Sequence, residues 1–174
     1  MKTVFILRHA KADRDDADGS DFERTLNERG RESALDMGRY FSSKKYSCAA
    51  VLCTSAFRTK QTYELFKEGA GLRAGVEFNE ALYLADIKML FARIQAVDDA
   101  LDSVMVIGHN PGLEQLANVL SGPAQDEISH GRQKRMKEKF STCAFAVIEL
   151  PVSHWNDVKA GRGKLVDFMR PRDF

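Results

Sequence analysis

Four side chains in this sequence have the chemistry needed to bind and transfer a phosphoryl group. A guanidinium offers paired donors that match phosphate oxygens, and a neutral imidazole is a nucleophile that can carry phosphorus. The residues concerned are Arg8, His9, Arg58 and His109. They are far apart along the chain, so this chemistry requires a fold that brings them together.

Each of these residues follows a short apolar run that is typical of a buried strand. The runs are 4–7, 49–53 and 104–107. A strand buried on both faces has no use for an Arg-His pair inside the core. We therefore place the polar residues just beyond the carboxyl ends of the strands, where open α/β sheets bind their ligands. If the three strands are parallel neighbours, two imidazoles and two guanidiniums converge on one edge of the sheet, which predicts a phosphate site.

The composition indicates one globular domain over residues 1–174, large enough to bury a core without disulfides or a structural metal. The net charge of +1 argues against a general nucleic-acid binder, yet it allows a small anionic substrate. No apolar stretch has the length of a membrane span, and the four apolar residues before Arg8 are too few for a signal-peptide core. The three cysteines form no C-x-x-C pair, which favours free thiols in a reducing compartment, and we expect the cytoplasm.

Helices are predicted between the strands by N-cap residues and by apolar side chains at helical spacing. The expected starts are Thr25, with Glu28 completing a capping box, then Ser55 for a helix to about Phe66, Asp86 and Gly112. Further strands are expected at 76–78, 143–150 and 164–169. Residues 122–140, which include His130, show no such periodicity and are expected to be irregular.

Two charged segments favour solvated surface over a binding site. The acidic segment 11–23 lacks the full calcium-loop pattern with its closing glutamate, so we interpret it as a loop and not as a metal site. The basic run Arg132–Lys139 could grip a partner, but charge runs are usually a solvated face or the flank of a loop. Arg24 allows two interpretations: a surface arginine, or a third guanidinium at a helix N-terminus, where anions are favoured.

Four segments, in this order, resemble the histidine phosphatase superfamily, which includes the cofactor-dependent phosphoglycerate mutases. They are 7–11, 24–26 with Gly30, 55–62 and 108–112. The length of the chain and the variant Arg-His-Ala-Lys resemble the small SixA-type branch of phosphohistidine phosphatases. Ala10 stands where the superfamily usually has glycine. The resemblance covers most of the chain and implies a three-layer α/β/α sandwich with a mostly parallel central sheet.

The resemblance also implies roles for individual residues. His9 becomes the nucleophile that forms a covalent phosphohistidine, which water then hydrolyses. The phosphate-binding residues that it implies are Arg8, Arg24, Arg58 and His109. Larger members carry a catalytic carboxylate on an inserted lobe, and here Glu80 stands near the corresponding place as the candidate general acid. No metal or other cofactor is expected, because side chains supply the cations.

The expected substrate follows from the leaving group. An alkoxide leaves badly without an acid, whereas a protonated imidazole, with a reference pKa of about 6.5, leaves readily. A short chain with a poorly defined acid therefore favours phosphohistidine on a protein. The alternatives are a phosphatase for small phosphate esters, a mutase, a non-catalytic phospho-ligand module that uses the basic run, and a metallohydrolase. The expected partner is a phosphorylated protein or a small phosphate ester, with no nucleic acid and no membrane.

Overall fold

The computed structural model describes residues 1–14 and 20–174. Its strands are β1 (Lys2–Arg8), β2 (Ala50–Thr54), β3 (Gly75–Asn79), β4 (Ser103–Gly108), β5 (Phe145–Leu150) and β6 (Lys164–Met169). Its helices are α1 (Glu28–Ser43), α2 (Phe57–Ala70), α3 (Ile87–Gln95), α4 (Gly112–Leu120) and α5 (Glu127–Glu138). All the predicted strands are present.

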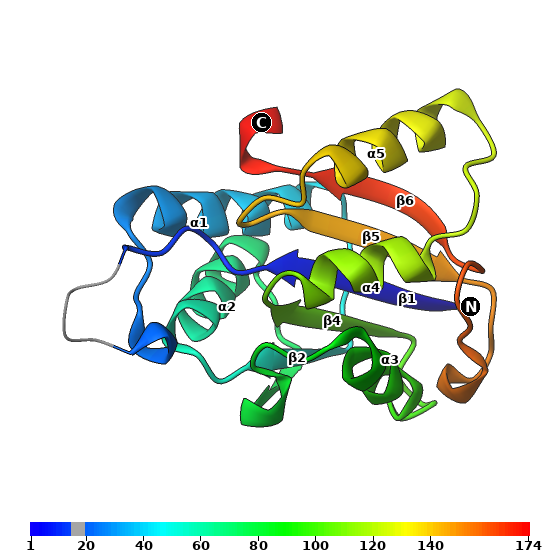
Figure 1. The fold of residues 1–174 in the computed structure, drawn as a ribbon, viewed down its shortest axis with the longest axis horizontal. Coiled ribbons are helices and arrows are strands. Elements are labelled where there is room, and N and C mark those ends of the chain that lie inside the picture. Colours follow the sequence, from blue (N-terminus) through cyan, green and yellow to red (C-terminus); the bar gives the residue numbers. More distant parts are fainter. Residues whose placement is uncertain (15–19) are drawn as a thin grey trace.

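The strands form one mixed sheet in the order β3-β2-β4-β1-β5-β6 (Figure 1). The first four are parallel to one another, and β5 is antiparallel to both β1 and β6. β6 therefore runs in the same direction as β1, and only β5 is reversed among the described strands. Because β2, β4 and β1 are parallel neighbours, their carboxyl ends meet at one edge of the sheet. The arrangement on which the predicted site depends is confirmed.

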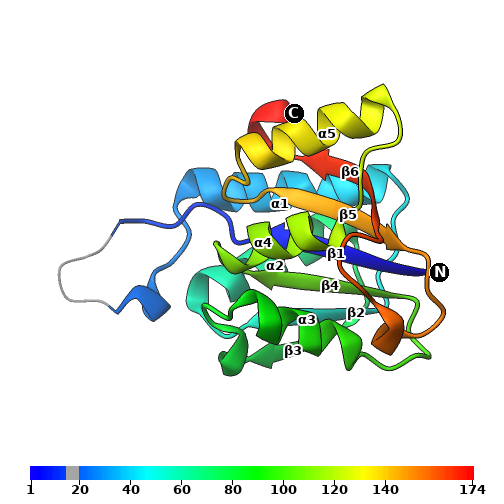
Figure 2. The same cartoon turned by 45° about the vertical axis from the view of Figure 1, so that its right-hand side comes forward.

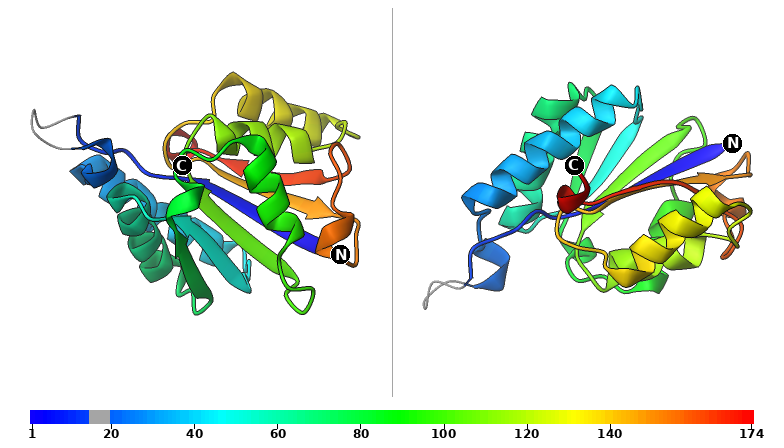
Figure 3. Two further views of the ribbon diagram at one scale, coloured as in Figure 1. Left: turned by 60° about the horizontal axis from the view of Figure 1, so that its bottom comes forward. Right: turned by 90° about the horizontal axis from the view of Figure 1, so that it is seen from above.

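Helices cover both faces of this sheet, so the predicted three-layer α/β/α sandwich is confirmed. The views in Figures 2 and 3 show α1 and α2 against one face and α3, α4 and α5 against the other. The pleat of β1 divides its side chains accordingly. Val4 and Ile6 pack in the core under α3 and α4, whereas Phe5 and Leu7 pack in the core under α1 and α2. β1 is thus buried on both faces until it reaches Arg8.

The start of α1 differs from the prediction. The helix is capped by Asn27, whose side-chain oxygen accepts a hydrogen bond of 2.8 Å from the backbone N–H of Gly30. Thr25 does not form the predicted capping box. Its carbonyl accepts a hydrogen bond from the backbone N–H of Asp13, and the next residue, Leu26, pairs with Ala12 in an isolated β-bridge. Residues 25 and 26 are therefore held in extended backbone, which delays the helix.

The other predicted boundaries are close to those observed. α2 begins after Ala56 with no side-chain cap, so the predicted cap at Ser55 is wrong by one residue. The helix also continues past Phe66, until Gly71 takes up a left-handed conformation with φ of 63°. The Asp86 cap is confirmed, since its carboxylate accepts a hydrogen bond from the N–H of Met89. The predicted bounds of α4 and β6 agree with the structure.

The segment predicted to be irregular contains helix α5, with His130 on it. Asp126 and Ser129 form a reciprocal capping box at its start, each side chain bonded to the backbone of the other residue. Only two residues of the helix, Ser129 and Met136, are buried. With so narrow a buried face the helix has no apolar stripe, which explains why hydrophobic spacing did not reveal it.

Three further predictions concern the cysteines, the acidic segment and membrane spans. Cys48, Cys53 and Cys143 are free thiols, as expected. Residues 15–19 of the acidic segment lie outside the described residues; in the rest of the segment Asp13 and Glu23 are exposed, as expected for solvated carboxylates, whereas Asp21 is bonded to Arg58. None of the helices in the described ranges is long and apolar enough to cross a membrane.

Candidate active site

β1 and β4 place their two histidines side by side at the sheet edge. The strands pair in register, with Arg8 opposite Gly108, and each histidine follows directly. The ring centroids of His9 and His109 are 5.2 Å apart, with an angle of 51° between the ring planes. The backbone N–H of His9 donates to the carbonyl of Gly108 at 3.0 Å. The ladder between the two strands thus continues into the site and fixes the separation of the imidazoles.

The ring of His9 is oriented as a nucleophile requires. Its Nδ1 lies 2.7 Å from the carbonyl oxygen of Ala10, so Nδ1 carries the proton and donates it to that oxygen. Nε2 is then the nitrogen with a free lone pair. Burial lowers the pKa of His9 to about 4; the positive charges of Arg58 and Arg8 add to this effect, while the Ala10 hydrogen bond opposes it. The imidazole is therefore neutral at neutral pH.

His109 has the opposite tautomer to His9, because its Nδ1 accepts a hydrogen bond. Nη2 of Arg58 lies 3.3 Å from Nδ1, and a guanidinium can only donate, so Nδ1 has no proton. Nε2 then donates to Oγ1 of Thr54 at 2.7 Å, and Thr54 is 2.8 Å from Oγ1 of Thr59. Burial lowers the pKa of His109 to about 3, with the neighbouring His9 and Arg58 next in importance. Both imidazoles are thus neutral in this state.

The two arginines retain hydrogen-bonding capacity that no protein group uses. Arg8 Nη1 donates to the carbonyl of Phe140 at 2.9 Å, and the Arg58 side chain is only 4% exposed in the first turn of α2. Nε of both arginines is buried without a hydrogen-bond partner among the described residues. Buried donors normally have partners, so these two are suited to an anion that binds between them.

Two site residues, Asp21 and Tyr83, were missed by the sequence reasoning. The Asp21 carboxylate accepts a hydrogen bond from Nη2 of Arg58 at 2.9 Å and another from the Tyr83 hydroxyl. The Tyr83 ring stands edge-on to His109, with centroids 5.2 Å apart. The Tyr83 hydrogen bond, followed by those from Arg24 and Arg58, holds the pKa of Asp21 well below its usual range. The site therefore contains an ionised carboxylate that already occupies one guanidinium.

Comparison with known proteins agrees with this geometry. No family model matches the chain. The chain is 32% identical over 166 residues to the uncharacterized protein Rv1276c of Mycobacterium tuberculosis, covering 95% of this chain and all of that one. A structure from Agrobacterium tumefaciens, assigned as the phosphohistidine phosphatase SixA, superposes with a TM-score of 0.78 at 25% identity over 98% of both chains. The protein histidine phosphatase SixA in complex with tungstate superposes with a TM-score of 0.77 at 26% identity, over 98% of this chain and 97% of that one.

The chain belongs to the histidine phosphatase superfamily, in its SixA-type branch. This membership supports a phosphatase and accounts for the phosphoglycerate mutase-like sheet. It leaves the role of each residue to be argued from the contacts that the residue makes.

Two further residues that the superfamily resemblance singled out are Arg24 and Glu80, and they make different contacts. Arg24 donates through Nη1 to Asp21 at 3.0 Å and through Nε to the carbonyl of Asp13 at 2.8 Å, and its charge contributes to the lowered pKa of His9. Glu80 is exposed on the short 3-10 helix Glu80–Leu82. Within the described residues, its side chain has no hydrogen bond or ion pair with the other candidate site residues. The phosphate-binding role of Arg24 and the acid role of Glu80 stay predictions.

Thr62 connects α2 of this histidine phosphatase to the loop that follows His9. Thr62 is fully buried. Its hydroxyl accepts a hydrogen bond from the backbone N–H of Ala10 at 2.9 Å and donates to the Arg58 carbonyl at 2.6 Å. Gln61, the preceding residue, accepts a hydrogen bond from the N–H of Leu26 at 2.7 Å. The helix that carries Arg58 therefore also positions the backbone next to His9.

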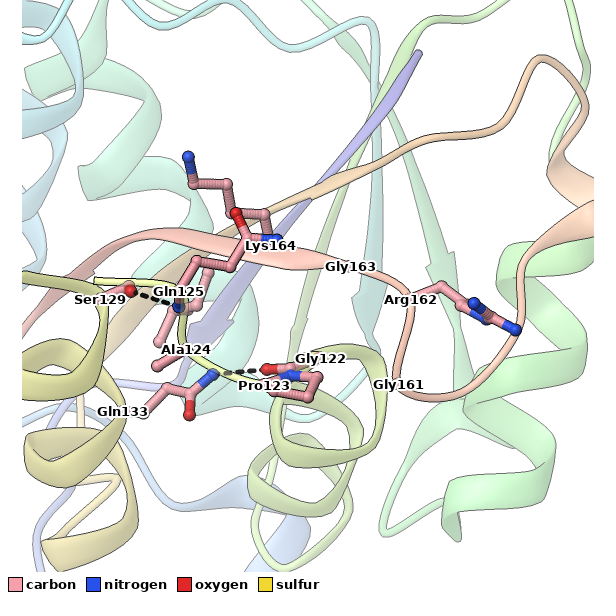
Figure 4. A pocket seen from close by; sticks show the side chains of 11 residues that line it. Gly122, Pro123, Ala124, Gln125, Ser129, Gln133, Gly161, Arg162, Gly163 and Lys164 are labelled. Atoms are coloured by element: carbon pink, nitrogen blue, oxygen red, sulfur yellow. Dashed lines mark hydrogen bonds between the residues drawn. The ribbon is translucent and has the colours of Figure 1, made fainter.

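Other parts of the described chain offer no comparable centre. No group of three or more His, Cys, Asp or Glu side chains among these residues is placed to hold a metal ion. A cavity of about 220 Å³ lies between the end of α4 and the start of β6 (Figure 4). It contains no histidine, and because β6 runs parallel to β1, it lies at the edge of the sheet opposite to the histidine pair. The chemistry is concentrated at the carboxyl edge.

Proposed function

We propose that this phosphatase removes the phosphoryl group from phosphohistidine on a protein, through a covalent phosphohistidine at His9. The observation that carries the proposal is the pair of neutral imidazoles, 5.2 Å apart, with the guanidiniums of Arg8 and Arg58 beside them. One ring has a free Nε2 for attack, and the arginines have donors left for phosphate oxygens.

In the first step, Nε2 of His9 forms a bond to phosphorus while the bond between phosphorus and the substrate nitrogen breaks. The substrate imidazole leaves as a neutral ring, because its other nitrogen already carries a proton. Arg8 and Arg58 offset the charge of the transferring group, which is the main contribution of a protein to phosphoryl transfer. The proton stays on Nδ1 of His9 throughout and keeps its hydrogen bond to the Ala10 carbonyl, so the ring does not rotate.

In the second step, water attacks phosphorus, the bond to Nε2 breaks, and phosphate leaves with both protons of the water. His9 returns to its neutral form. His109 begins neutral, but a bound phosphate raises the pKa of a neighbouring imidazole. We therefore assign His109 the stabilisation of charge on the transferring group once substrate is bound.

The choice of substrate rests on the state of Asp21, the carboxylate that is bonded to Arg58. Asp21 is bonded to Arg58 and Tyr83, and its lowered pKa makes it a poor proton donor at neutral pH. An alkoxide leaving group would need such a donor, whereas the imidazole of a phosphohistidine does not. The local charges thus favour phosphohistidine over an ordinary phosphate ester.

The test is a dephosphorylation panel of phosphohistidine proteins, phosphotyrosine peptides and sugar phosphates, with trapping of the phosphoenzyme. We expect the fastest turnover on phosphohistidine, together with an acid-labile and base-stable label. His9→Ala should abolish label and turnover, and His154→Ala, at an exposed histidine, should retain both. Turnover that persists in His9→Ala would refute the covalent mechanism.

The same panel distinguishes the alternatives. A phosphatase for small esters would favour sugar phosphates, and Glu80→Gln should then cost more on alkyl phosphates than on phosphohistidine. A label that persists for hours and is discharged only by phosphoglycerate would indicate a mutase. Absence of turnover by the unsubstituted protein would favour a binding module, and loss of turnover in excess chelator would indicate a metallohydrolase. We also propose a cytoplasmic location and a single domain, the first because all three cysteines are free thiols.

A further inference from the structure

A basic pocket of about 400 Å³ lies next to the candidate active site. Arg8 lines this pocket and is also a residue of that site. The cations that line it are Arg8, Lys11, Arg29, Lys139 and Arg172. Three hydroxyl side chains, Ser33, Ser141 and Thr142, are also in its wall. Among the described residues, no carboxylate lines it, although Arg172 forms an ion pair of 3.3 Å with Glu138 outside the lining. We refer to this feature as the basic pocket.

The walls of the basic pocket come from segments far apart in the sequence. Figure 1 shows the start of α1, the turn before β5 and the C-terminus gathered at the end of the sheet to which β1 points. The turn is fixed to the site, because the Phe140 carbonyl accepts hydrogen bonds from Arg8 at 2.9 Å and from Asn110 at 3.0 Å. The backbone of Lys11 is fixed to α1, since its carbonyl accepts from the N–H of Asn27 at 3.1 Å. The pocket is therefore preformed beside the nucleophile.

The charge of the basic pocket is out of proportion to that of the chain. The whole sequence has a net charge of +1, yet five of the nine lining residues are cations. The cavity of Figure 4 provides a contrast, since only Arg162 and Lys164 of its eleven lining residues are cationic. A concave surface lined by one sign of charge concentrates the field and attracts the opposite charge. The expected ligand of the basic pocket is an anion.

We propose that the basic pocket is a second anion subsite, which takes acidic side chains of the phosphorylated protein next to its phosphohistidine. The inference rests on the proposed function. Arg8 directly precedes His9 and lines the basic pocket, so the part of the substrate next to its phosphoryl group would lie at the pocket. Lys11, Arg29 and Lys139 are exposed at the rim. Long cationic side chains at an open rim suit adaptable contacts with carboxylates on a protein surface, which set specificity and encounter rate.

The basic run Arg132–Lys139 has a mixed role under this proposal. Lys139, at the end of α5, lines the pocket, whereas Arg135 donates through Nη2 to the Phe168 carbonyl at 3.1 Å. Lys134 and Lys137 are exposed on α5 and do not line the pocket. They provide a matched control, because their removal changes the net charge equally and leaves the pocket intact.

The test compares two phosphohistidine peptides that differ only in having glutamate or glutamine at the positions flanking the phosphohistidine. We expect kcat/KM to be about fivefold higher for the glutamate peptide, as one or two partly exposed ion pairs would give. In Arg29→Gln/Arg172→Gln the ratio should fall to about one, and in Lys134→Gln/Lys137→Gln it should stay at the wild-type value. The charge-preserving variant Arg29→Lys/Arg172→Lys should keep most of the preference for the glutamate peptide. This result would show that the loss in the glutamine variant comes from the missing charges and not from a folding defect.

Equal rates on the two peptides in the wild type would overturn the subsite, as would a preference that survives Arg29→Gln/Arg172→Gln. A preference for a small bisphosphate over its monophosphate, without a peptide preference, would overturn the acidic-protein occupant. Failure of the proposed function has a different readout. It would appear as no turnover of the glutamine peptide or of p-nitrophenyl phosphate, neither of which needs the pocket.

Discussion

The buried histidine pair should lower the stability of the folded protein at acid pH. Substitution of these histidines should remove this loss of stability. His9 and His109 have pKa values of about 4 and about 3 in the folded state. An unfolded histidine titrates near ~6.5. Between these values the unfolded chain binds protons that the folded chain does not, so stability falls as the pH is lowered from about 6.5 towards about 4.

The magnitude follows from the pKa difference. At about pH 5, protonation stabilises each unfolded histidine by about 2 kcal/mol, since 1.5 pH units at ~1.36 kcal/mol each separate that pH from ~6.5. Neither ring is charged in the folded state at that pH, so their mutual repulsion does not enter. We therefore compare the free energy of unfolding of each variant with that of the wild type at about pH 8 and at about pH 5. This difference should shift in favour of His9→Gln by about 2 kcal/mol at the lower pH, and in favour of His9→Gln/His109→Gln by about 4 kcal/mol.

The assay is urea unfolding of wild type and variants at both pH values, with the stability difference compared between them. The control is Gln115→Ala, an exposed substitution that removes no titrating group, whose difference from wild type should be the same at both pH values. NMR titration of the two imidazoles gives an independent measure. A His9→Gln difference that is also independent of pH would refute the conclusion that burial keeps these rings neutral.

Three other substitutions probe the frame of the site. A Cβ at Gly30 would clash with the backbone carbonyl oxygen of Lys11, so Gly30→Ala should destabilise the fold by about 1–3 kcal/mol and lower turnover; unchanged unfolding in urea would contradict the packing. Thr62→Val leaves the buried N–H of Ala10 without a partner and should cost about 1–3 kcal/mol by the same assay, whereas a neutral result would mean that the loop has another anchor. Asp21→Asn removes an anion that competes for Arg58, so the inhibition constant of inorganic phosphate should fall about fivefold, and a rise would count against the competition.

Much of this architecture could be predicted because the candidate site residues directly follow the buried strands in the sequence. The apolar runs before His9 and His109 are fully buried strands, and the polar residues that interrupt them mark the sheet edge. Arg58 was placed correctly in the first turn of α2, although the cap itself was misjudged by one residue. Where burial and polarity change sharply at one position, the pattern alone locates the site.

The remaining features depend on contacts that spacing does not encode. Asp21 belongs to an acidic segment and appears solvated from the sequence, yet Arg58 and Tyr83 approach it from distant parts of the chain. α5 was missed because a helix with only two buried residues has no periodic apolar face. Thr62 resembles any polar helix residue until the fold brings the Ala10 N–H to its hydroxyl.

The backbone of His9 is bonded on both sides, its N–H to Gly108 and its carbonyl to the N–H of Cys143, each at 3.0 Å. If His9 is the nucleophile, as we propose, this anchoring keeps its main chain in place and the phosphoryl group comes to a stationary ring. Amide hydrogen exchange at residue 9 should then require opening of the sheet itself, at a rate set by global unfolding. We expect changes of specificity to arise in the surrounding loops, because the backbone of residue 9 is bonded to two neighbouring segments.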